Sequence, residues 1–294
     1  MSEPSKFRRV AVLGTGLIGG SFALAVKRQI PGVVVAGYDR PEELQKARSR
    51  GAIDEACADI PGAVGGAALV YIALPIVAAI RSLGEVAAAA ETGALVTDAC
   101  STKAAICREA AEQFRANLGA KFLGGHPMAG REASGIENAD ATLLHGARYV
   151  LVGVEPGDKL PEDARVEAFV GLLEKMGAEP VWFDAETHDW AAGIVSHLPQ
   201  LVSIALGRVI EDETDETGLP VSLAGGGLRD ALRLAASPYS VWRDICLTNT
   251  ENVRRALDRM EQAVEYLRTH LTSRELEKEF RAANEAYKAL QKGQ

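Results

Sequence analysis

The chain has little of what marks proteins that work outside the cytoplasm or in a membrane. Its four cysteines are scattered over 294 residues, without the spacing of a disulfide framework or a metal site. No unbroken apolar run reaches the roughly 18 residues that a membrane-spanning helix needs. The start of the chain, Met1 to Arg9, is short and polar, unlike a secretory signal. We therefore expect a reduced, cytoplasmic protein with no metal site and no membrane segment.

Net positive charge is also lacking. The formal charge is −8 at pH 7, which argues against nucleic acid as a partner, because such binding needs a basic surface. An anionic small molecule would likewise need a local pocket of cationic groups. With 47% apolar and 24% charged residues, the composition is that of a soluble globular protein, and 294 residues are enough for two domains.

The first part of the chain alternates short strand-like runs with helical segments, which is typical of a parallel sheet covered by helices. Strand-like sequence stops after Asp184. The pattern predicts an α/β domain of the Rossmann type over residues 1–184, followed by an all-α helical domain over residues 185–294. Within the first domain it predicts helices at 19–28, 42–50 and 162–176, and strands at 10–13, 33–38, 68–74, 94–97, 149–153 and 180–183.

The all-α domain has apolar stripes that need partners. Trp190, Ile194, His197, Leu201 and Ile204 repeat at three-and-four spacing. A seven-residue apolar repeat then runs through 253–271 and resumes over 276–290. These stripes would pack either in a bundle within one chain or against a second copy. Since the segment has only about 110 residues, we favour a homodimer through this domain, because obligate interfaces resemble a core split in two.

A Gly-x-Gly-x-x-Gly motif, formed by Gly14, Gly16 and Gly19, follows the first predicted strand and opens the first predicted helix. In that context the first glycine allows a tight turn, the second lets the backbone approach a pyrophosphate, and the third allows close helix–strand packing. Leu17 and Ile18 lie at the helix N-terminus, where free N–H groups bind phosphates. The sequence therefore predicts a dinucleotide site.

Two further residues bear on which dinucleotide binds there. Asp39 ends the second predicted strand, 20 residues after Gly19, where a carboxylate accepts hydrogen bonds from ribose hydroxyls and repels a 2′-phosphate. Asp39 therefore favours NAD. Arg40 leaves NADP open, because a guanidinium in this place would receive the 2′-phosphate. Pro75, after the third predicted strand, is expected to shape the loop beneath the cofactor.

A second glycine-rich stretch, residues 124–130, reads Gly-Gly-His-Pro-Met-Ala-Gly. We expect His126 to lie in a turn after the short strand-like run 121–123. A neutral imidazole has a pKa of about 6.5, so it is an efficient general base close to neutral pH. An alcohol that gives up a hydride must also lose a proton. A dinucleotide site and a base therefore fit one reaction.

In order along the chain, these motifs resemble the prephenate and arogenate dehydrogenase family of tyrosine biosynthesis. The resemblance covers about residues 8–290. It implies a Rossmann domain, a helical dimerisation domain, and an NAD(P)-dependent oxidative decarboxylation of a cyclohexadienol. The product would be 4-hydroxyphenylpyruvate from prephenate or tyrosine from arogenate. Besides the glycine motif and Asp39, the resemblance rests on residues 98–103, 125–130, 186–189, 196–199, 225–230, 233–235, 237–238 and 242–245.

The resemblance implies roles for single residues around the reacting centre. His126 would accept the hydroxyl proton of the substrate while a hydride leaves C4 for the nicotinamide. Ser101 would bond the substrate hydroxyl or His126 beside the cofactor, and by its position it would also cap the helix that follows. Lys103 is expected to be solvated. His188 matches a family position near the domain junction, and its role stays open.

Four residues resemble the substrate-binding positions of the family. His197 and Arg233 would lie at the substrate carboxylates, and Glu132 and Trp242 would lie at the entrance. A separate physical argument supports arginine: a dianionic substrate in a chain of net charge −8 needs fixed cations, and arginine binds carboxylates bidentately. We therefore expect Arg233 to hold a carboxylate of the anionic small-molecule substrate.

Two other functions fit the same fold. A β-hydroxyacid dehydrogenase also joins a Rossmann half to a helical half. That class uses a catalytic lysine in the helical domain, and residues 190–210 contain none. The other alternative is a non-enzymatic protein that senses a dinucleotide, because a fold does not fix a function. Such a protein would not need His126, His197 and Arg233 to converge.

Overall fold

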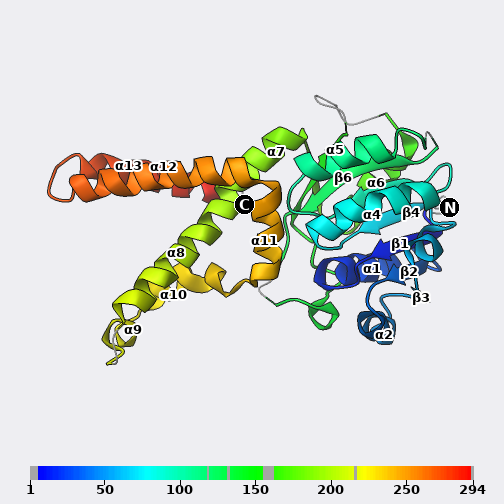
Figure 1. The fold of residues 1–294 in the computed structure, drawn as a ribbon, viewed down its shortest axis with the longest axis horizontal. Helices are drawn as coiled ribbons and strands as arrows, with labels where there is room; N and C mark the ends of the chain where they lie inside the picture. Colours follow the sequence, from blue (N-terminus) through cyan, green and yellow to red (C-terminus); the bar gives the residue numbers. More distant parts are fainter. Residues whose placement is uncertain (1–5, 118, 131–132, 155–161, 215–216, 293–294) are drawn as a thin grey trace.

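The computed structural model describes residues 6–117, 119–130, 133–154, 162–214 and 217–292. Figure 1 shows an α/β part that holds the N-terminus and, beside it, helices that project away from it as two arms. The last strand of the α/β part, β8, ends at Phe183, and the first helix of the other part, α7, begins at Ala185.

One sheet of eight strands forms the centre of the α/β part, in the order β3-β2-β1-β4-β5-β6-β7-β8. The order of its first six strands is that of a dinucleotide-binding fold. All neighbouring strands are parallel except β6 and β7, which are antiparallel. The strands are β1 (Arg9–Leu13), β2 (Val34–Tyr38), β3 (Glu55–Cys57), β4 (Leu69–Ile72), β5 (Leu95–Asp98), β6 (Lys121–Pro127), β7 (Arg148–Val152) and β8 (Glu179–Phe183).

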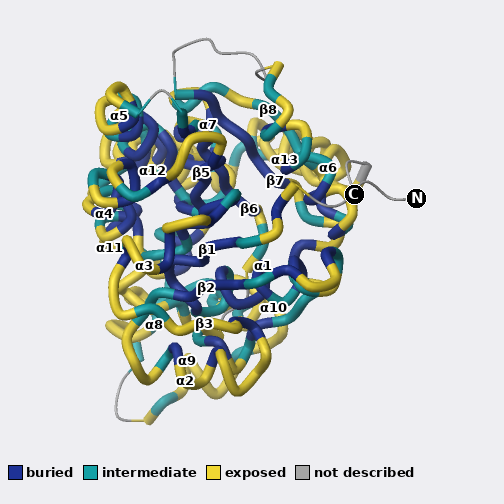
Figure 2. The backbone as a smooth tube through the Cα atoms, turned by 90° about the vertical axis from the view of Figure 1, so that its right-hand side faces the viewer, coloured by how far each residue is buried: buried dark blue, intermediate teal, exposed yellow. Residues whose placement is uncertain are grey.

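Helices cover both faces of the sheet. Because successive side chains of a strand point to opposite faces, Val10 and Val12 of β1 join one apolar cluster, and Ala11 and Leu13 join the other. Figure 2 shows the strands as the buried layer between more exposed helices. The first cluster includes residues of α1 (Leu17–Gln29), α2 (Pro41–Ser49) and α6 (Ala164–Lys175); the second includes residues of α3 (Ile60–Val64), α4 (Ile76–Ala89) and α5 (Ala104–Gln113).

The predicted strands and helices of this part are present, with ends shifted by a few residues. Strand β3 was not predicted. It has only three residues, lies at the edge of the sheet and is mostly exposed, so it lacks the apolar pattern that identifies a strand. The antiparallel β7 follows a connection that contains only the short turn η1 (Ile136–Asn138) among its described residues, rather than a crossover helix.

The structure corrects the predicted position of His126. Strand β6 continues to Pro127, and His126 lies within it, opposite Val150 of β7. The glycines that suggested a turn are required by close packing: a Cβ on Gly125 would lie 2.4 Å from the carbonyl oxygen of Asp98. Glycine inside a strand often marks such a close approach. His126 is therefore held by the sheet rather than by a loop.

The helical part begins with one long helix. α7 (Ala185–Ala192) continues through a π-helical turn, η2 (Gly193–His197), into α8 (Leu198–Glu213). Turns of this type inside α-helices are frequent at functional sites. The remaining elements are α9 (Leu219–Ser222), α10 (Gly226–Leu232), η3 (Arg233–Ala236), α11 (Tyr239–Thr248), α12 (Thr250–Thr269) and α13 (Leu276–Lys292).

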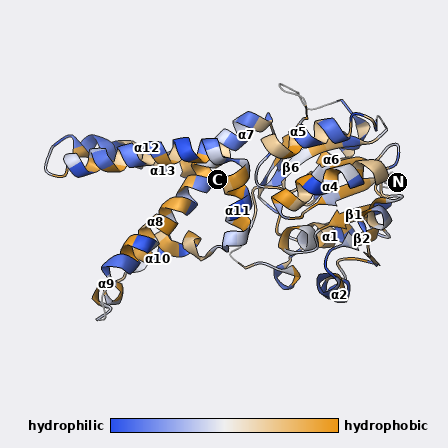
Figure 3. Cartoon of the chain, viewed as in Figure 1, coloured by the Kyte–Doolittle hydropathy of each residue, from blue (hydrophilic) through white to orange (hydrophobic). Residues whose placement is uncertain are grey.

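The two arms expose apolar side chains. Figure 3 shows apolar residues along α8. By length and composition alone, the helix Ala185–Glu213 could also cross a membrane. The prediction of no membrane segment counted unbroken apolar runs and therefore did not single out this helix. One such helix is weak evidence for a membrane, because helices that pack against protein pass the same test.

Candidate active site

The glycine loop between β1 and α1 has the shape that a dinucleotide needs. Gly14 has a φ of +91°, and a Cβ there would lie 2.4 Å from the carbonyl oxygen of Ala73. A Cβ on Gly19 would lie 1.9 Å from the carbonyl oxygen of Gly14, so the helix packs closely on the loop. Around Gly16 a Cβ would meet nothing within 4 Å. The backbone at Gly16 is therefore open to a phosphate group.

The carboxylate of Asp39 lies at the end of β2, next to this loop. Its oxygens accept hydrogen bonds from the backbone N–H of Thr15 and of Arg40, each at 2.7 Å. The hydroxyl of Thr15 lies 3.2 Å from the same carboxylate. A carboxylate has about four acceptor positions, so Asp39 keeps capacity for a ribose hydroxyl. The side chain of Arg40 is exposed beside it.

The other predicted cofactor residues lie along the same edge of the sheet. Leu17 begins α1 and Ile18 follows it, both half-buried. Pro75 lies after β4 and forms the N-cap of α4. The carboxyl ends of β1, β2 and β4 thus bring together the glycine motif, Asp39, Arg40 and Pro75, which lie far apart in the sequence.

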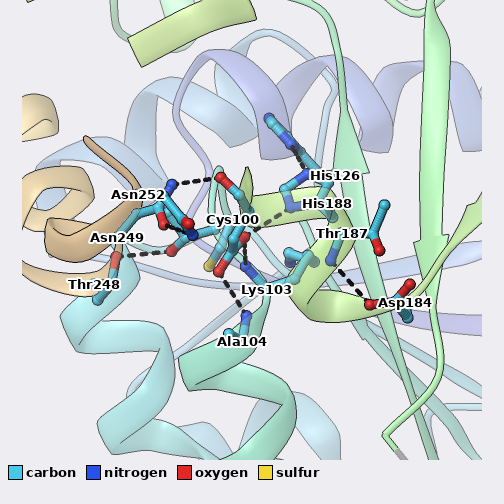
Figure 4. A network of polar contacts seen from close by, with 12 residues as sticks. Cys100, Lys103, Ala104, His126, Asp184, Thr187, His188, Thr248, Asn249 and Asn252 are labelled. Carbon is cyan, nitrogen blue, oxygen red and sulfur yellow. Dashed lines mark hydrogen bonds and ion pairs between the residues drawn. The ribbon is translucent and has the colours of Figure 1, made fainter. Parts of the chain in front are cut away.

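His126 belongs to a chain of three hydrogen-bonded side chains. Its Nδ1 lies 2.8 Å from Nε2 of His188, and Nδ1 of His188 lies 2.8 Å from Oδ1 of Asp189. All three residues are buried, with His126 8% exposed and Asp189 1% exposed. Figure 4 shows the two imidazole rings meeting between β6 and the start of the helical part.

The positions of the protons in this chain follow from Asp189. An ionised carboxylate only accepts, so Nδ1 of His188 carries a proton and donates it to Asp189. Nε2 of His188 then accepts from Nδ1–H of His126. The lone pair of His126 is left on Nε2, on the other side of its ring. His126 is thereby arranged to accept a proton.

The surroundings of His126 keep it uncharged. Burial lowers the pKa of His126 well below its ordinary value, and the neighbouring His188, Lys103 and His197 lower it further. The imidazole is therefore neutral at pH 7, which is the form that a general base requires.

Asp189 also joins the helical part to the α/β part. Its two carboxylate oxygens accept hydrogen bonds from the backbone N–H of Lys103 at 2.7 Å and of Ala104 at 2.9 Å, at the N-terminus of α5. A carboxylate is favourable there, because the first N–H groups of a helix are otherwise unpaired. The predicted cap, Ser101, does not cap α5, since the helix begins three residues after it. Ser101 is half-buried at the end of β5, just before this junction.

Lys103 is buried rather than solvated, which corrects the prediction. Its Nζ forms an ion pair with Asp98 and donates to the carbonyl oxygen of Gly125 at 2.6 Å. Asp98 accepts from the backbone N–H of Gly125 at 3.0 Å. Burial alone would lower the pKa of Lys103, but Asp98 raises it above the ordinary value, so the charge is retained. The pair holds the residue before His126 by both its backbone groups.

His197 lies in the π-helical turn η2 and is 1% exposed. Its Nδ1 lies 3.2 Å from Nδ2 of Asn249, and Nδ2 of Asn249 also donates to the backbone carbonyl of Asp189 at 2.7 Å. The ring of Trp242 packs edge-on against His197, with a centroid distance of 5.8 Å. The structure thus brings His197 and Trp242 next to the chain of His126.

A second carboxylate joins the two parts. Asp244 of α11 accepts from the backbone N–H of Val77, in the first turn of α4, at 3.2 Å. It also forms an ion pair with its neighbour Arg243 at 2.8 Å. Arg243 therefore already has a carboxylate partner within the chain. Asp244 and Asp189 act alike, each at the N-terminus of a helix of the α/β part.

The structure does not place every predicted substrate residue in this cluster. Arg233 begins η3, which packs on α8 through hydrogen bonds such as Gln200 Nε2 to the carbonyl of Leu234 at 2.7 Å. Its side chain is exposed in the single chain. Glu132 lies outside the described residues. Among the residues that the structure describes, no group of three or more His, Cys, Asp or Glu side chains could hold a metal ion.

Three residues of the cluster were missed from the sequence: Asp189, Asn249 and, as a buried group, Lys103. A signal for the first was present, because Thr187, His188 and Asp189 follow within six residues of the last strand. No spacing rule predicts the burial of Lys103 or the contacts of Asn249, since Gly125 lies 22 residues from Lys103 and Asp189 lies 60 residues from Asn249.

Two models of known families match the chain. The nucleotide-binding domain of prephenate dehydrogenase matches residues 22–181, and the dimerization domain of prephenate dehydrogenase matches residues 184–284. Among curated proteins, the prephenate dehydrogenase of Lactococcus lactis is 34% identical over 269 residues, which are 91% of this chain and 72% of that protein.

Solved structures show the same similarity over both parts of the chain. The prephenate dehydrogenase of Aquifex aeolicus, solved with hydroxyphenyl propionate and NAD+, has a TM-score of 0.82 at 29% identity and covers 100% of this chain and 99% of its own. The arogenate dehydrogenase of Synechocystis has a TM-score of 0.79 at 28% identity, and the match covers 97% of this chain and 100% of that one.

The buried Lys103–Asp98 pair yields a prediction. Lys103→Met should lower the free energy of unfolding by roughly 3–5 kcal/mol, because the buried carboxylate of Asp98 would lose its cationic partner. Urea unfolding of the purified protein measures this loss. The double variant Lys103→Met/Asp98→Asn should regain part of it, since no uncompensated charge remains.

Lys121→Met is the matched control. The side chain of Lys121 is 31% exposed and its Nζ lies 3.9 Å from Asp163, so its loss should cost less than about 1 kcal/mol. If Lys103→Met and Lys121→Met were equally stable, the buried pair would not hold β5 and β6 together as described.

Proposed function

Because the chain belongs to the prephenate dehydrogenase family, we propose that it oxidatively decarboxylates prephenate to 4-hydroxyphenylpyruvate, or arogenate to tyrosine, with NAD+. It is an oxidoreductase with a nucleotide-binding domain. The observation that supports the proposal most is the chain His126–His188–Asp189, which leaves the lone pair of a neutral imidazole open at the carboxyl edge of the sheet. Family membership disfavours the β-hydroxyacid dehydrogenase and the non-enzymatic sensor.

The residues of the glycine loop fit a dinucleotide. The open space at Gly16 and the free N–H groups at the start of α1 suit the pyrophosphate, and the remaining acceptor capacity of Asp39 suits the adenosine ribose. When bound, NAD+ supplies the hydride acceptor. We propose NAD as the preferred cofactor because Asp39 would repel a 2′-phosphate. The exposed Arg40 beside it keeps NADP as the second candidate.

His126 handles the proton of the reaction. Its Nε2 accepts the proton of the 4-hydroxyl as the C4–H bond gives up its hydride, and C4 becomes a carbonyl carbon. The ring carboxylate then leaves as carbon dioxide, and its bonding electrons make the ring aromatic and the oxygen a phenolate. His126 returns the proton to that phenolate, so no net proton is lost. His188 and Asp189 stabilise the protonated His126 in between.

The remaining predicted residues are proposed to hold the substrate. His197 and Trp242 lie next to the base and would contact the substrate directly. Ser101, at the end of β5, would bond the hydroxyl group beside the cofactor. Arg233 would hold a carboxylate, and Glu132 would lie at the entrance. A cytoplasmic location also stays a prediction.

We also propose that the chain forms a homodimer through its helical part. The apolar repeat of α12 and α13 has no cover in the single chain: Val264 is 51% exposed, Leu271 67% and Phe280 66%. Burying such a stripe removes apolar surface from water, at roughly 25 cal/mol per Å². The match to a dimerization domain over residues 184–284 supports this proposal. A second copy would cover the stripe as a core split between two chains.

The substrate is tested by the rate of NADH formation with each candidate. Purified protein should reduce NAD+ in the presence of prephenate, of arogenate or of both, and should not reduce it with neither. Reduction only with a 3-hydroxy acid would replace the proposal by the β-hydroxyacid alternative. The same assay with NADP+ tests the role of Asp39 and Arg40.

The role of His126 is tested by His126→Asn. We expect turnover to fall by about two to four orders of magnitude, as for loss of a general base, while NAD+ binding stays nearly unchanged. Stopped-flow kinetics measure turnover, and a cofactor titration measures NAD+ binding. His145→Asn is the control, because His145 is exposed; it should behave like the native chain. Unchanged turnover in His126→Asn would remove His126 from the mechanism.

The dimer is tested by Val264→Glu. A carboxylate in the apolar stripe of α12 should shift the protein toward the monomer, because a charge buried at an interface without a partner is unfavourable. Light scattering during size-exclusion chromatography measures the mass. Gln262→Glu adds the same charge to an exposed position two residues away, on another side of α12, and should leave the mass unchanged. A native chain that is monomeric at micromolar concentration would contradict the proposal.

A further inference from the structure

Asn249 lies at the junction of α11 and α12 and is 4% exposed. All of its side-chain hydrogen-bonding groups face named partners. Its Nδ2 donates to the backbone carbonyl of Asp189 at 2.7 Å and lies 3.2 Å from Nδ1 of His197. Its Oδ1 accepts from Nδ2 of Asn252 at 2.8 Å. Figure 4 shows Asn249 and Asn252 reaching from α12 toward the residues at the end of β5.

The orientation of the Asn249 amide follows from these partners. The carbonyl of Asp189 can only accept, so the NH2 group and not the oxygen of Asn249 faces it. The oxygen is then left for the NH2 group of Asn252. The second N–H of Asn249 points to His197, and an amide N–H can only donate. Nδ1 of His197 must therefore be unprotonated, and the single proton of the neutral ring is on Nε2.

We propose that Asn249 is a positioning residue that fixes His197 in the Nε2–H tautomer, so that His197 offers the anionic substrate a hydrogen-bond donor. The inference rests on the proposed function, in which His197 contacts the substrate. Because Nδ1 is turned toward Asn249, Nε2 lies on the opposite side of the ring. Among the described residues, the hydrogen bond of the His197 ring is made through Nδ1, so Nε2 is the nitrogen left for a ligand.

The tautomer matters because His197 is uncharged. Burial is the main cause that lowers the pKa of His197 to about 4. The nearby Asp189 raises this pKa, and His188 lowers it further. The titratable groups around the ring are His188 and Asp189 from α7 and His126 from β6, whereas α11 and α12 contribute the uncharged Trp242 and Asn249. At neutral pH His197 thus binds as a donor and not as a cation.

The wrong tautomer would oppose binding. With the proton on Nδ1, the lone pair of Nε2 would face a carboxylate or a hydroxyl oxygen of the substrate and repel it. Asn249 excludes this state because its own N–H would then meet another N–H. Its second bond, to the backbone of Asp189, ties the substrate contact to the residue that orders the base.

The tautomer can be read without substrate. In a long-range 1H–15N correlation spectrum of protein with 15N-labelled histidines, His197 should show an unprotonated Nδ1 and a protonated Nε2 at pH 7. The loss of its signals in His197→Gln assigns them. A protonated Nδ1 in the native protein would overturn the inference, whatever the substrate of the enzyme is. Absence of prephenate and arogenate oxidation would instead overturn the proposed function and leave this result in place.

Asn249→Asp then tests the consequence for binding. A carboxylate at this position can only accept, so Nδ1 of His197 would become protonated, and the pKa of His197 would rise from about 4 toward neutrality. At about pH 6 the protonated ring still donates from Nε2, and KM should stay near the native value. Toward about pH 8.5 the ring becomes neutral with its lone pair on Nε2, and KM should rise on the order of ten-fold or more. Turnover at saturation should change little.

Gln262→Glu is the control, because it adds the same charge to an exposed position of α12 that contacts neither Asn249 nor His197. Its KM should stay as flat with pH as that of the native chain, since the hydrogen bonds of Asn249 are unchanged. A KM that rises equally at all pH values in Asn249→Asp, with the tautomer of His197 unchanged, would show that Asn249 only supports packing and would overturn the inference.

Discussion

The carboxylate of Asp189 is the group on which the site depends. It accepts the first N–H groups of α5, and it accepts Nδ1–H of His188. The first bonds attach the helical part to the α/β part, and the second fixes the proton on His188 and through it the proton on His126. Docking of the two parts and preparation of the base are therefore one event. If the two parts were separated, His188 of α7 could not bond to His126 of β6, and the ring of His126 would lose the partner that orients it.

Burial and neighbouring charges together decide which side chains of the site are charged. Lys103 keeps its charge because Asp98 accompanies it, while His126 and His197 lose theirs because water is excluded and cationic or polar neighbours surround them. The result is a set of neutral imidazoles whose protons are directed by acceptors and donors rather than by pH. The fixed cation that an anionic substrate needs in a chain of net charge −8 was expected from Arg233 and not from these imidazoles.

Much of the α/β part could be predicted because its signals are local. The glycine motif, the apolar runs and Asp39 lie within 30 residues of each other, and their meaning depends on backbone sterics that act over a few residues. The errors came where local signals have two explanations. Gly124 and Gly125 suggested a turn, but they allow β6 to pass close to the end of β5. Ser101 suggested a helix cap, but a carboxylate from another element takes that place.

The sequence by itself determined the Rossmann order of elements, the dinucleotide loop and the helical second part with its apolar stripes, and it predicted His126 as the base. These follow from residue type and spacing, which act along the chain. Only the tertiary structure decided that Lys103 is buried against Asp98, that Asp189 orders His188 and His126, and that Asn249 meets His197. The reason is that hydrogen-bond partners and desolvation depend on residues distant in sequence, and no periodicity encodes which of them will meet.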